Sequence, residues 1–139
     1  MVRLFETLDA MKQEGSDELT AMDVASKDIV SVQSVDTVHH ASEILKSTGY
    51  SQLPVLRGDA PVGSISERDV FEMMRQGFTM DQMKATQVAK VMKECFPIVS
   101  DSTPLATVTM LLSESNAVIV AEKGRMVGLI TNADMLKLI

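Results

Sequence analysis

The chain has 139 residues, 45% of them hydrophobic, and a formal net charge of −6. This composition excludes general disorder, and the acidic balance argues against direct nucleic-acid binding, because phosphate contacts need a basic face. The single Cys95 excludes an internal disulfide framework and is typical of a reducing compartment. No apolar run approaches the roughly 20 residues of a transmembrane helix, and the N-terminal pattern is not that of a signal peptide. We therefore expect a soluble, cytoplasmic protein that does not contact a membrane.

The first residues are predicted to form a helix followed by a linker. Leu4, Leu8 and Met11 recur at helical spacing within residues 1–14, and Gly15 begins a polar stretch that ends the helical pattern. An amphipathic helix this short is not stable alone. We expect it to pack on the rest of the chain or on a partner.

The remainder of the chain contains the same order of elements twice. Ile29–Val32 and Phe96–Val99 are short strand-like runs, and each leads after a similar distance into a helical pattern. Further along, Leu53–Val55 aligns with Val118–Val120, and each of these runs precedes a turn and another strand-like run. The sequence therefore predicts an internal repeat.

The two predicted helices that follow the first strands have different start signals. Asp36 or Thr37 can cap the helix in the first copy. In the second copy we expect Thr103 to be the cap and Pro104 to lie in the first turn.

Two seven-residue stretches, Gly63–Asp69 and Gly128–Asp134, share the pattern Gly-x-x-Ser/Thr-x-x-Asp. Each follows an apolar run and precedes a helical pattern. A hydroxyl residue at a helix start suits a phosphate, and an aspartate three residues later can accept hydrogen bonds from a sugar diol. The same spacing is also that of a helix capping box, which binds nothing. Both interpretations are open at this point.

We predict an α+β fold made of two tandem β-α-β-β-α repeats. The predicted boundaries are 1–19 for the N-terminal helix and linker, 20–76 for repeat 1, 77–88 for a connector and 89–139 for repeat 2. A repeat this small cannot easily bury its sheet face alone, so we expect the two copies to pack together.

The order of elements, the doubled motif and the lead-in Asp28–Val32 resemble a pair of cystathionine-β-synthase-type (CBS) domains, or Bateman module. Cys95–Val99 and Asn116–Val120 are similar to the second domain of the C-terminal CBS pairs of prokaryotic regulators, notably archaeal ones. Phe5–Leu8 is similar to the linker that precedes such pairs. The resemblance implies two repeats packed with pseudo-twofold symmetry, two clefts between them, and a homodimer.

In many members of that family the clefts bind adenosine-containing ligands: AMP, ADP, ATP, S-adenosylmethionine or methylthioadenosine. Carried over by motif, Asp69 and Asp134 would bind ribose hydroxyls, and Ser66 and Thr131 would contact the phosphate. The resemblance also implies apolar walls around adenine, formed by Ile29, Val30, Ile65, Phe96, Pro97 and Ile130.

The two copies of the motif differ in charge. Arg68 adds a positive charge to the first copy, whereas the second copy has Asn132 and Ala133 at the corresponding positions. We therefore expect the first site to accept a polyphosphate more readily and the second to prefer a phosphate-poor ligand. Arg68 and Asn132 are both candidate ligand contacts.

Eleven methionines are many for a chain with one tyrosine and no tryptophan. Methionine is an adaptable core residue, and it also suits soft binding surfaces. A self-association surface is the second interpretation, with four candidates: Met73, Met74, Met80 and Met83.

The sequence favours a regulatory sensor that requires no cofactor and passes ligand occupancy to a partner. The alternative is a ligand-free dimerisation scaffold of a larger regulator. We expect no enzyme activity, because no nucleophile is paired with a base and no metal-ligand set is present. His39 and His40 point about 100° apart on a helix, and Cys95 has no activating partner in the pattern.

Overall fold

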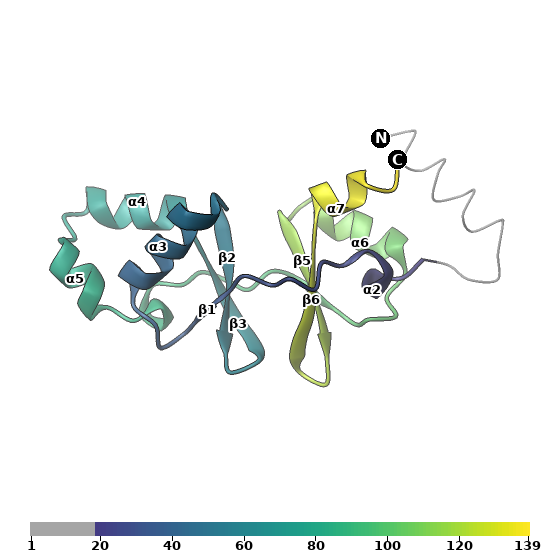
Figure 1. Ribbon diagram of the computed structural model, residues 1–139, viewed down its shortest axis with the longest axis horizontal. Coiled ribbons are helices and arrows are strands. Elements are labelled where there is room, and N and C mark those ends of the chain that lie inside the picture. The colour runs from purple at the N-terminus through teal and green to yellow at the C-terminus, as the bar shows by residue number, and fades with distance from the viewer. Residues whose placement is uncertain (1–18) are drawn as a thin grey trace. The chain divides into compact units, whose positions relative to one another are not determined.

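The computed structural model describes residues 19–139, so the helix predicted over residues 1–14 lies outside the described residues. The described chain divides into two compact units (Figure 1). The first unit is Val30–Cys95. The second unit is Phe96–Ile139 together with the segment that ends at Ile29.

The first unit contains a three-stranded sheet in the order β1-β2-β3. Strand β1 pairs parallel to β2, and β2 forms an antiparallel hairpin with β3. The elements in chain order are β1 (Val32–Gln33), α3 (Val38–Thr48), β2 (Gln52–Arg57), β3 (Ala60–Ser66), α4 (Glu67–Arg75), α5 (Met80–Ala85) and the 3-10 helix η1 (Val88–Lys90).

The second unit repeats this sheet, in the order β4-β5-β6, with the same parallel and antiparallel pairings. Its elements in chain order are α2 (Ala21–Val24), β4 (Ile98–Val99), α6 (Leu105–Leu112), β5 (Ala117–Glu122), β6 (Arg125–Thr131) and α7 (Asn132–Leu136). The two tandem repeats of helices and mixed sheets confirm the predicted α+β fold.

The repeat extends to the details of strand pairing. Val55 lies opposite Gly63, and Val120 lies opposite Gly128. A register shift follows immediately in each hairpin, between Val55 and Leu56 and between Val120 and Ala121. The alignment of the two strand pairs predicted from the sequence is therefore confirmed.

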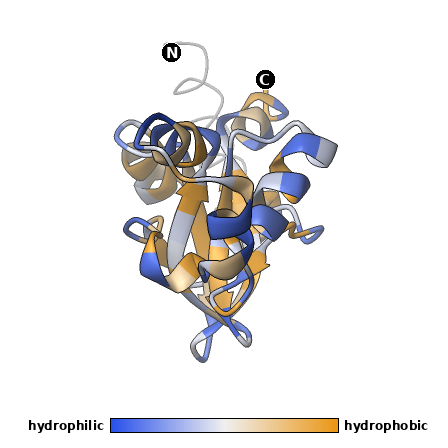
Figure 2. Cartoon of the chain, turned by 90° about the vertical axis from the view of Figure 1, so that its left-hand side faces the viewer, coloured by the Kyte–Doolittle hydropathy of each residue, from blue (hydrophilic) through white to orange (hydrophobic). Residues whose placement is uncertain are grey.

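Each unit has its own apolar core. The strands are largely hydrophobic and the loops that close the hairpins are hydrophilic (Figure 2). In the first unit, α3, α4 and η1 pack on the sheet through a cluster that includes Val38, Leu53 and Val88. In the second, α2, α6 and α7 pack through a cluster that includes Ala21 and Val108.

The predicted helix starts are half right. Thr37 is the N-cap of α3, and its Oγ1 accepts a hydrogen bond from the His40 N–H at 3.0 Å. The prediction of Thr103 as the second cap is wrong, because Pro104 holds that position. The Thr103 hydroxyl instead accepts a hydrogen bond from the Ser100 N–H at 3.0 Å, within the turn before the helix.

The strands are shorter than the predicted strand-like runs, and the connector contains a helix that was not predicted. β1 begins only at Val32 and β4 only at Ile98, so the first residues of each run lie outside the strands. The connector contains α5, which buries Met83, and Met73 is buried as well. These two methionines are core residues, which excludes them from an association surface, whereas Met74 and Met80 are exposed.

The segments that lead into the two repeats are exchanged: each one pairs with the last strand of the other repeat. Ser26 and Leu129 exchange backbone hydrogen bonds of 2.8 and 3.0 Å, so the lead-in at the start of repeat 1 pairs with β6 of repeat 2. In the first unit, Ser64 and Lys93 exchange bonds of 3.0 and 2.8 Å in the same way. Each compact unit is therefore completed by chain that the sequence places next to the other repeat.

Candidate functional site

The motif of repeat 1 lies where β3 ends and α4 begins. Ser66 is the N-cap of α4, in an extended conformation, and its Oγ accepts a hydrogen bond from the Asp69 N–H at 3.1 Å. Asp69 Oδ2 accepts one in return from the Ser66 N–H at 2.9 Å. The capping-box interpretation is therefore confirmed for this copy, and the two side chains are held in fixed positions at the helix start.

The capping box of repeat 1 leaves one carboxylate oxygen and one hydroxyl proton without a hydrogen-bond partner among residues 19–139. Among residues 19–139, Asp69 is hydrogen-bonded only through Oδ2, so its second carboxylate oxygen has no partner. The Ser66 hydroxyl acts only as an acceptor within this part of the chain, so its proton is free to be donated. Asp69 is half-buried and the neighbouring Arg68 is exposed. Capping and ligand binding are therefore compatible in this copy.

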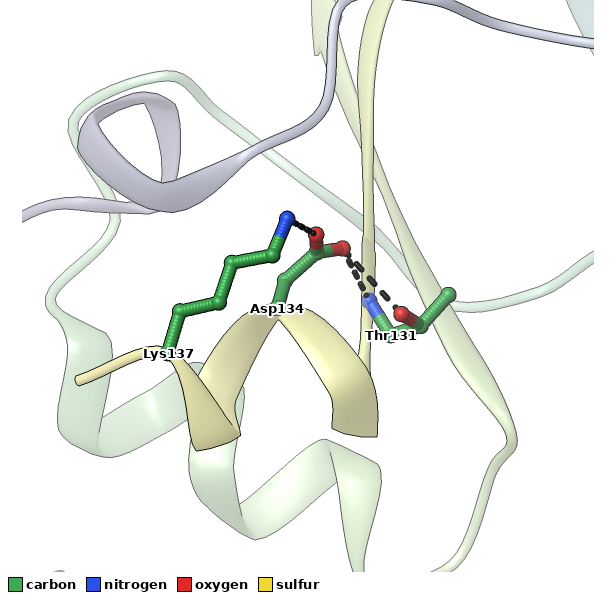
Figure 3. Close-up of polar contacts among 3 residues, drawn as sticks. All are labelled: Thr131, Asp134 and Lys137. Carbon is green, nitrogen blue, oxygen red and sulfur yellow. Dashed lines mark hydrogen bonds and ion pairs between the residues drawn. The ribbon is translucent and has the colours of Figure 1, made fainter. Parts of the chain in front are cut away.

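In repeat 2 the hydroxyl and carboxylate groups of the same motif all have partners within the chain. Asp134 Oδ2 accepts hydrogen bonds from the Thr131 N–H at 2.8 Å and from the Thr131 hydroxyl at 3.2 Å. Lys137 Nζ lies 3.4 Å from the other carboxylate oxygen, Oδ1 (Figure 3). Asp134 is 8% exposed. Both of its oxygens and the threonine proton are thus engaged.

The glycine of each motif lies where an exchanged segment crosses the strand. A Cβ on Gly63 would lie 2.6 Å from Met92 Sδ and 3.0 Å from the Lys93 carbonyl oxygen. A Cβ on Gly128 would lie 2.8 Å from the Ala25 Cβ. At these separations a neighbouring atom would have to move to make room for a side chain, so close packing favours glycine at both positions. The backbone of each motif is in this way fixed against the crossing segment.

The apolar residues expected to form walls around adenine are distributed over both units. Ile65 and Ile130 are fully buried in the cores of their own units, which leaves their side chains no exposed surface for a ligand there. Phe96 is also buried, and Pro97 is half-buried and accepts a hydrogen bond from the Ile119 N–H at 2.8 Å. Ile29 and Val30 are half-buried, and they lie where the chain passes from the second unit to the first.

The remaining candidate residues give weaker indications of a functional site than Asp69 and Asp134 do. Asn132 is exposed in the first turn of α7. His39 Nδ1 pairs with Glu43 at 3.1 Å on α3, Cys95 is half-buried, and no three acidic, histidine or cysteine side chains of residues 19–139 are placed to hold a metal ion. In that same range no helix is long and apolar enough to cross a membrane.

Sequence reasoning missed Lys137. It lies outside the seven-residue motif, and its role depends on a helical turn that brings it beside Asp134. The available signal was the spacing of three residues between an acid and a base, which places the two side chains on one face of a helix.

Comparison with known proteins places these features in a family. The CBS domain family model matches residues 21–76 and 88–139. The CBS domains of a transcriptional regulator from Streptococcus pneumoniae superpose with a TM-score of 0.70 at 23% identity, covering 87% of this chain and 99% of that chain.

Two similar structures hold nucleotides. CBSX2 in complex with AMP has a TM-score of 0.71 at 22% identity, over 85% of this chain and 93% of that chain. The CBS domain of a bacterial CNNM/CorC family Mg²⁺ transporter in complex with ATP has a TM-score of 0.78 at 17% identity, over 97% and 93%. At these identities the likeness shows the fold. Together with the two matched segments, it establishes that the chain belongs to the CBS domain family, as a tandem pair of CBS repeats.

Proposed function

We propose that this CBS pair is a regulatory sensor for an adenosine-containing ligand, namely AMP, ADP, ATP or S-adenosylmethionine, and that repeat 1 holds the stronger site. The observation that carries the proposal is the unpaired Oδ1 of Asp69 beside the Ser66 hydroxyl, at the start of a nine-residue helix. The AMP and ATP complexes of two proteins of the same fold support this ligand class.

The chemistry of repeat 1 suits a nucleoside with an anionic substituent. A ribose diol presents two donors, and a carboxylate oxygen with two lone pairs accepts both. The free Ser66 proton at the positive end of α4 suits an anion, and Arg68 adds a positive charge. Val30, half-buried in the same compact unit, is the apolar residue that we propose for the base.

The exchanged lead-in offers a route by which ligand occupancy reaches a partner. The pairing of Ser26 with Leu129 lies on β6, two residues before Thr131. A ligand that favours one arrangement of the motif would also bias the lead-in, and through it the N-terminal residues of the chain. In this proposal the protein acts in the cytoplasm, without catalysis, without a required cofactor and without contact with a membrane or nucleic acid.

Calorimetric titration of the chain with AMP, ADP, ATP and S-adenosylmethionine tests the ligand class, and Asp69→Asn tests the site. Asparagine keeps an oxygen for the Ser66 N–H, so the cap is retained, but it removes the charge and the second acceptor. Loss of a hydrogen bond to a charged group weakens binding by about 10- to 100-fold. Asp81→Asn, an exposed acid in the first turn of α5, is the matched control.

Unchanged affinity in Asp69→Asn, at an unchanged melting temperature, would contradict the assignment of the site.

The competing function is the ligand-free dimerisation scaffold. It is favoured by exposed apolar residues at matching positions of the two repeats: Phe71, Met74, Leu136 and Ile139. A ligand at 100 times its Kd adds about 2.7 kcal/mol of stability. A dimer that shows no melting shift with any ligand would support the scaffold instead.

A further inference from the structure

The ion pair of Lys137 with Asp134 joins two very different environments. The carboxylate side chain of Asp134 is 9% exposed, and the side chain of Lys137 is 76% exposed. The buried carboxylate is therefore fixed by Thr131, while the ammonium group can leave Oδ1 at little cost, because an exposed ion pair is weak. Lys137 is thus a solvent-exposed cation beside a nearly buried, hydrogen-bonded anion.

Repeat 1 has the opposite charge at the position that corresponds to Lys137. Glu72 lies three residues after Asp69, as Lys137 lies three residues after Asp134, and Glu72 pairs with Arg75 on the exposed face of α4. No cation contacts Asp69 within residues 19–139. The two aspartates therefore differ in whether a cation of the chain contacts the carboxylate oxygen that the capping box leaves unused.

This difference has a consequence for which ligand repeat 2 accepts. A ribose diol that bonds Asp134 Oδ1 must displace Lys137 Nζ, which lies 3.4 Å from that oxygen. A ligand without a phosphate gives the displaced ammonium group no anion in return. A ligand with a 5′-phosphate carries an anion one sugar ring away from its diol, within reach of a four-carbon side chain.

We propose, on the basis of the proposed function, that Lys137 is a specificity-determining residue of repeat 2. It competes with the ribose of a phosphate-free ligand for Asp134, and it moves to the phosphate of a phosphorylated one. Repeat 2 consequently selects phosphorylated adenosine ligands over unphosphorylated ones. This reverses the preference expected from the motif alone, in which Asn132 and Ala133 suggested a phosphate-poor ligand.

The test compares the affinities of AMP and adenosine in a chain whose site in repeat 1 is weakened. Asp69→Asn provides that background, because it removes the second acceptor of repeat 1 and keeps its cap. Lys137→Met is then added, since methionine removes the charge and retains the apolar stem. We expect adenosine to bind up to about fivefold more tightly and AMP to bind more weakly, because an exposed ion pair is worth a factor of this size. The ratio of the two affinities falls by about fivefold or more.

Two further variants separate this role from a general effect of charge. Lys137→Arg keeps a cation and is expected to retain the AMP preference of the parent. Lys84→Met removes an exposed cation from the last turn of α5 in the first unit and should leave the ratio unchanged. Melting temperatures of all variants show whether each one is folded.

The outcomes distinguish this proposal from the one on which it depends. If the parent chain binds neither AMP nor adenosine, the proposed function fails and this inference fails with it. If the parent binds AMP but the Asp69→Asn chain binds neither ligand, with or without Lys137, repeat 2 is not a site and only this inference is overturned. An affinity ratio that is the same with lysine and methionine at position 137 overturns it as well.

Discussion

Repeats 1 and 2 have the same strand order, the same pairing directions and a register shift at the same place in the hairpin. They differ at three points where side chains or turns meet: the crossing over the motif glycine, the hairpin turn and the surroundings of the aspartate. Backbone pairing therefore fixes where the hydroxyl residue and the aspartate lie. Residues outside the motif determine how tightly each copy is held and whether its carboxylate is open to a ligand.

The largest expected effect concerns the crossing at the motif glycine. In Gly128→Ala the new methyl group would meet the Ala25 Cβ at 2.8 Å, and neither group can rotate away. In Gly63→Ala the nearest atom is the Met92 sulfur, at the far end of a flexible side chain, although the Lys93 carbonyl oxygen is also close. We expect Gly128→Ala to lower the free energy of unfolding by about 1–3 kcal/mol, and Gly63→Ala by less, measured by urea denaturation.

A double-mutant cycle provides the control for this comparison. Ala25→Gly removes the methyl group that the new side chain would meet, so it should recover a large part of the loss in Gly128→Ala. Equal losses in the two single glycine variants, with no recovery in the double variant, would show that the crossing segment is not what requires the glycine.

The second prediction uses the hairpin turns. Gly58 has a φ of 63° in the first hairpin, and Lys123 has a φ of 53° at the matching place in the second. A side chain other than glycine or asparagine is disfavoured in the left-handed region by roughly 1–2 kcal/mol. Lys123→Asn creates an Asn-Gly turn with Gly124, whose φ of 78° is also positive, and this pair is preferred in tight hairpins.

We therefore expect Lys123→Asn to raise the melting temperature, with a gain in the free energy of unfolding of about 1 kcal/mol. Gly58→Ala is the converse change, because a Cβ there meets no atom within 4 Å and any loss is conformational. It should destabilise by a similar amount. A loss of stability in Lys123→Asn would mean that the lysine side chain makes a contribution larger than the strain of its backbone.

The sequence alone predicts the repeat because strand-like runs and turn residues recur at matching places, and these signals are local. It also places Ser66, Asp69, Thr131 and Asp134 correctly at helix starts. It does not reveal that Ser26 pairs with Leu129, because nothing local distinguishes a lead-in that packs on its own repeat from one that packs on the other. The burial that separates the environments of the two aspartates depends on the folded unit and cannot be read from the motif.

Two cases show how far the residue type alone predicts the partner of a side chain. Thr103 has the residue type of a helix cap, but a competing bond to the Ser100 N–H uses its hydroxyl and leaves Pro104 at the helix start. The apolar residue of each motif, Ile65 or Ile130, has the composition of a ligand wall and is covered by its own core. Residue type specifies what a side chain can do, whereas tertiary packing decides which partner it meets.

The smallest expected effect compares the ion pairs that follow the two aspartates. Lys137→Met removes a cation from a carboxylate that stays nearly buried, and we expect a loss of about 0.5 kcal/mol in the free energy of unfolding. Glu72→Met removes the pair with Arg75, in which both side chains are well exposed, and should change stability by less. The loss in Lys137→Met stays small because Thr131 still donates two hydrogen bonds to Asp134.

Denaturation in low salt and in 1 M NaCl checks the cause, since the difference between the parent and Lys137→Met should shrink as salt screens the pair. A difference that does not depend on salt would show that the lysine stabilises repeat 2 by packing its stem, and not by its charge at Asp134.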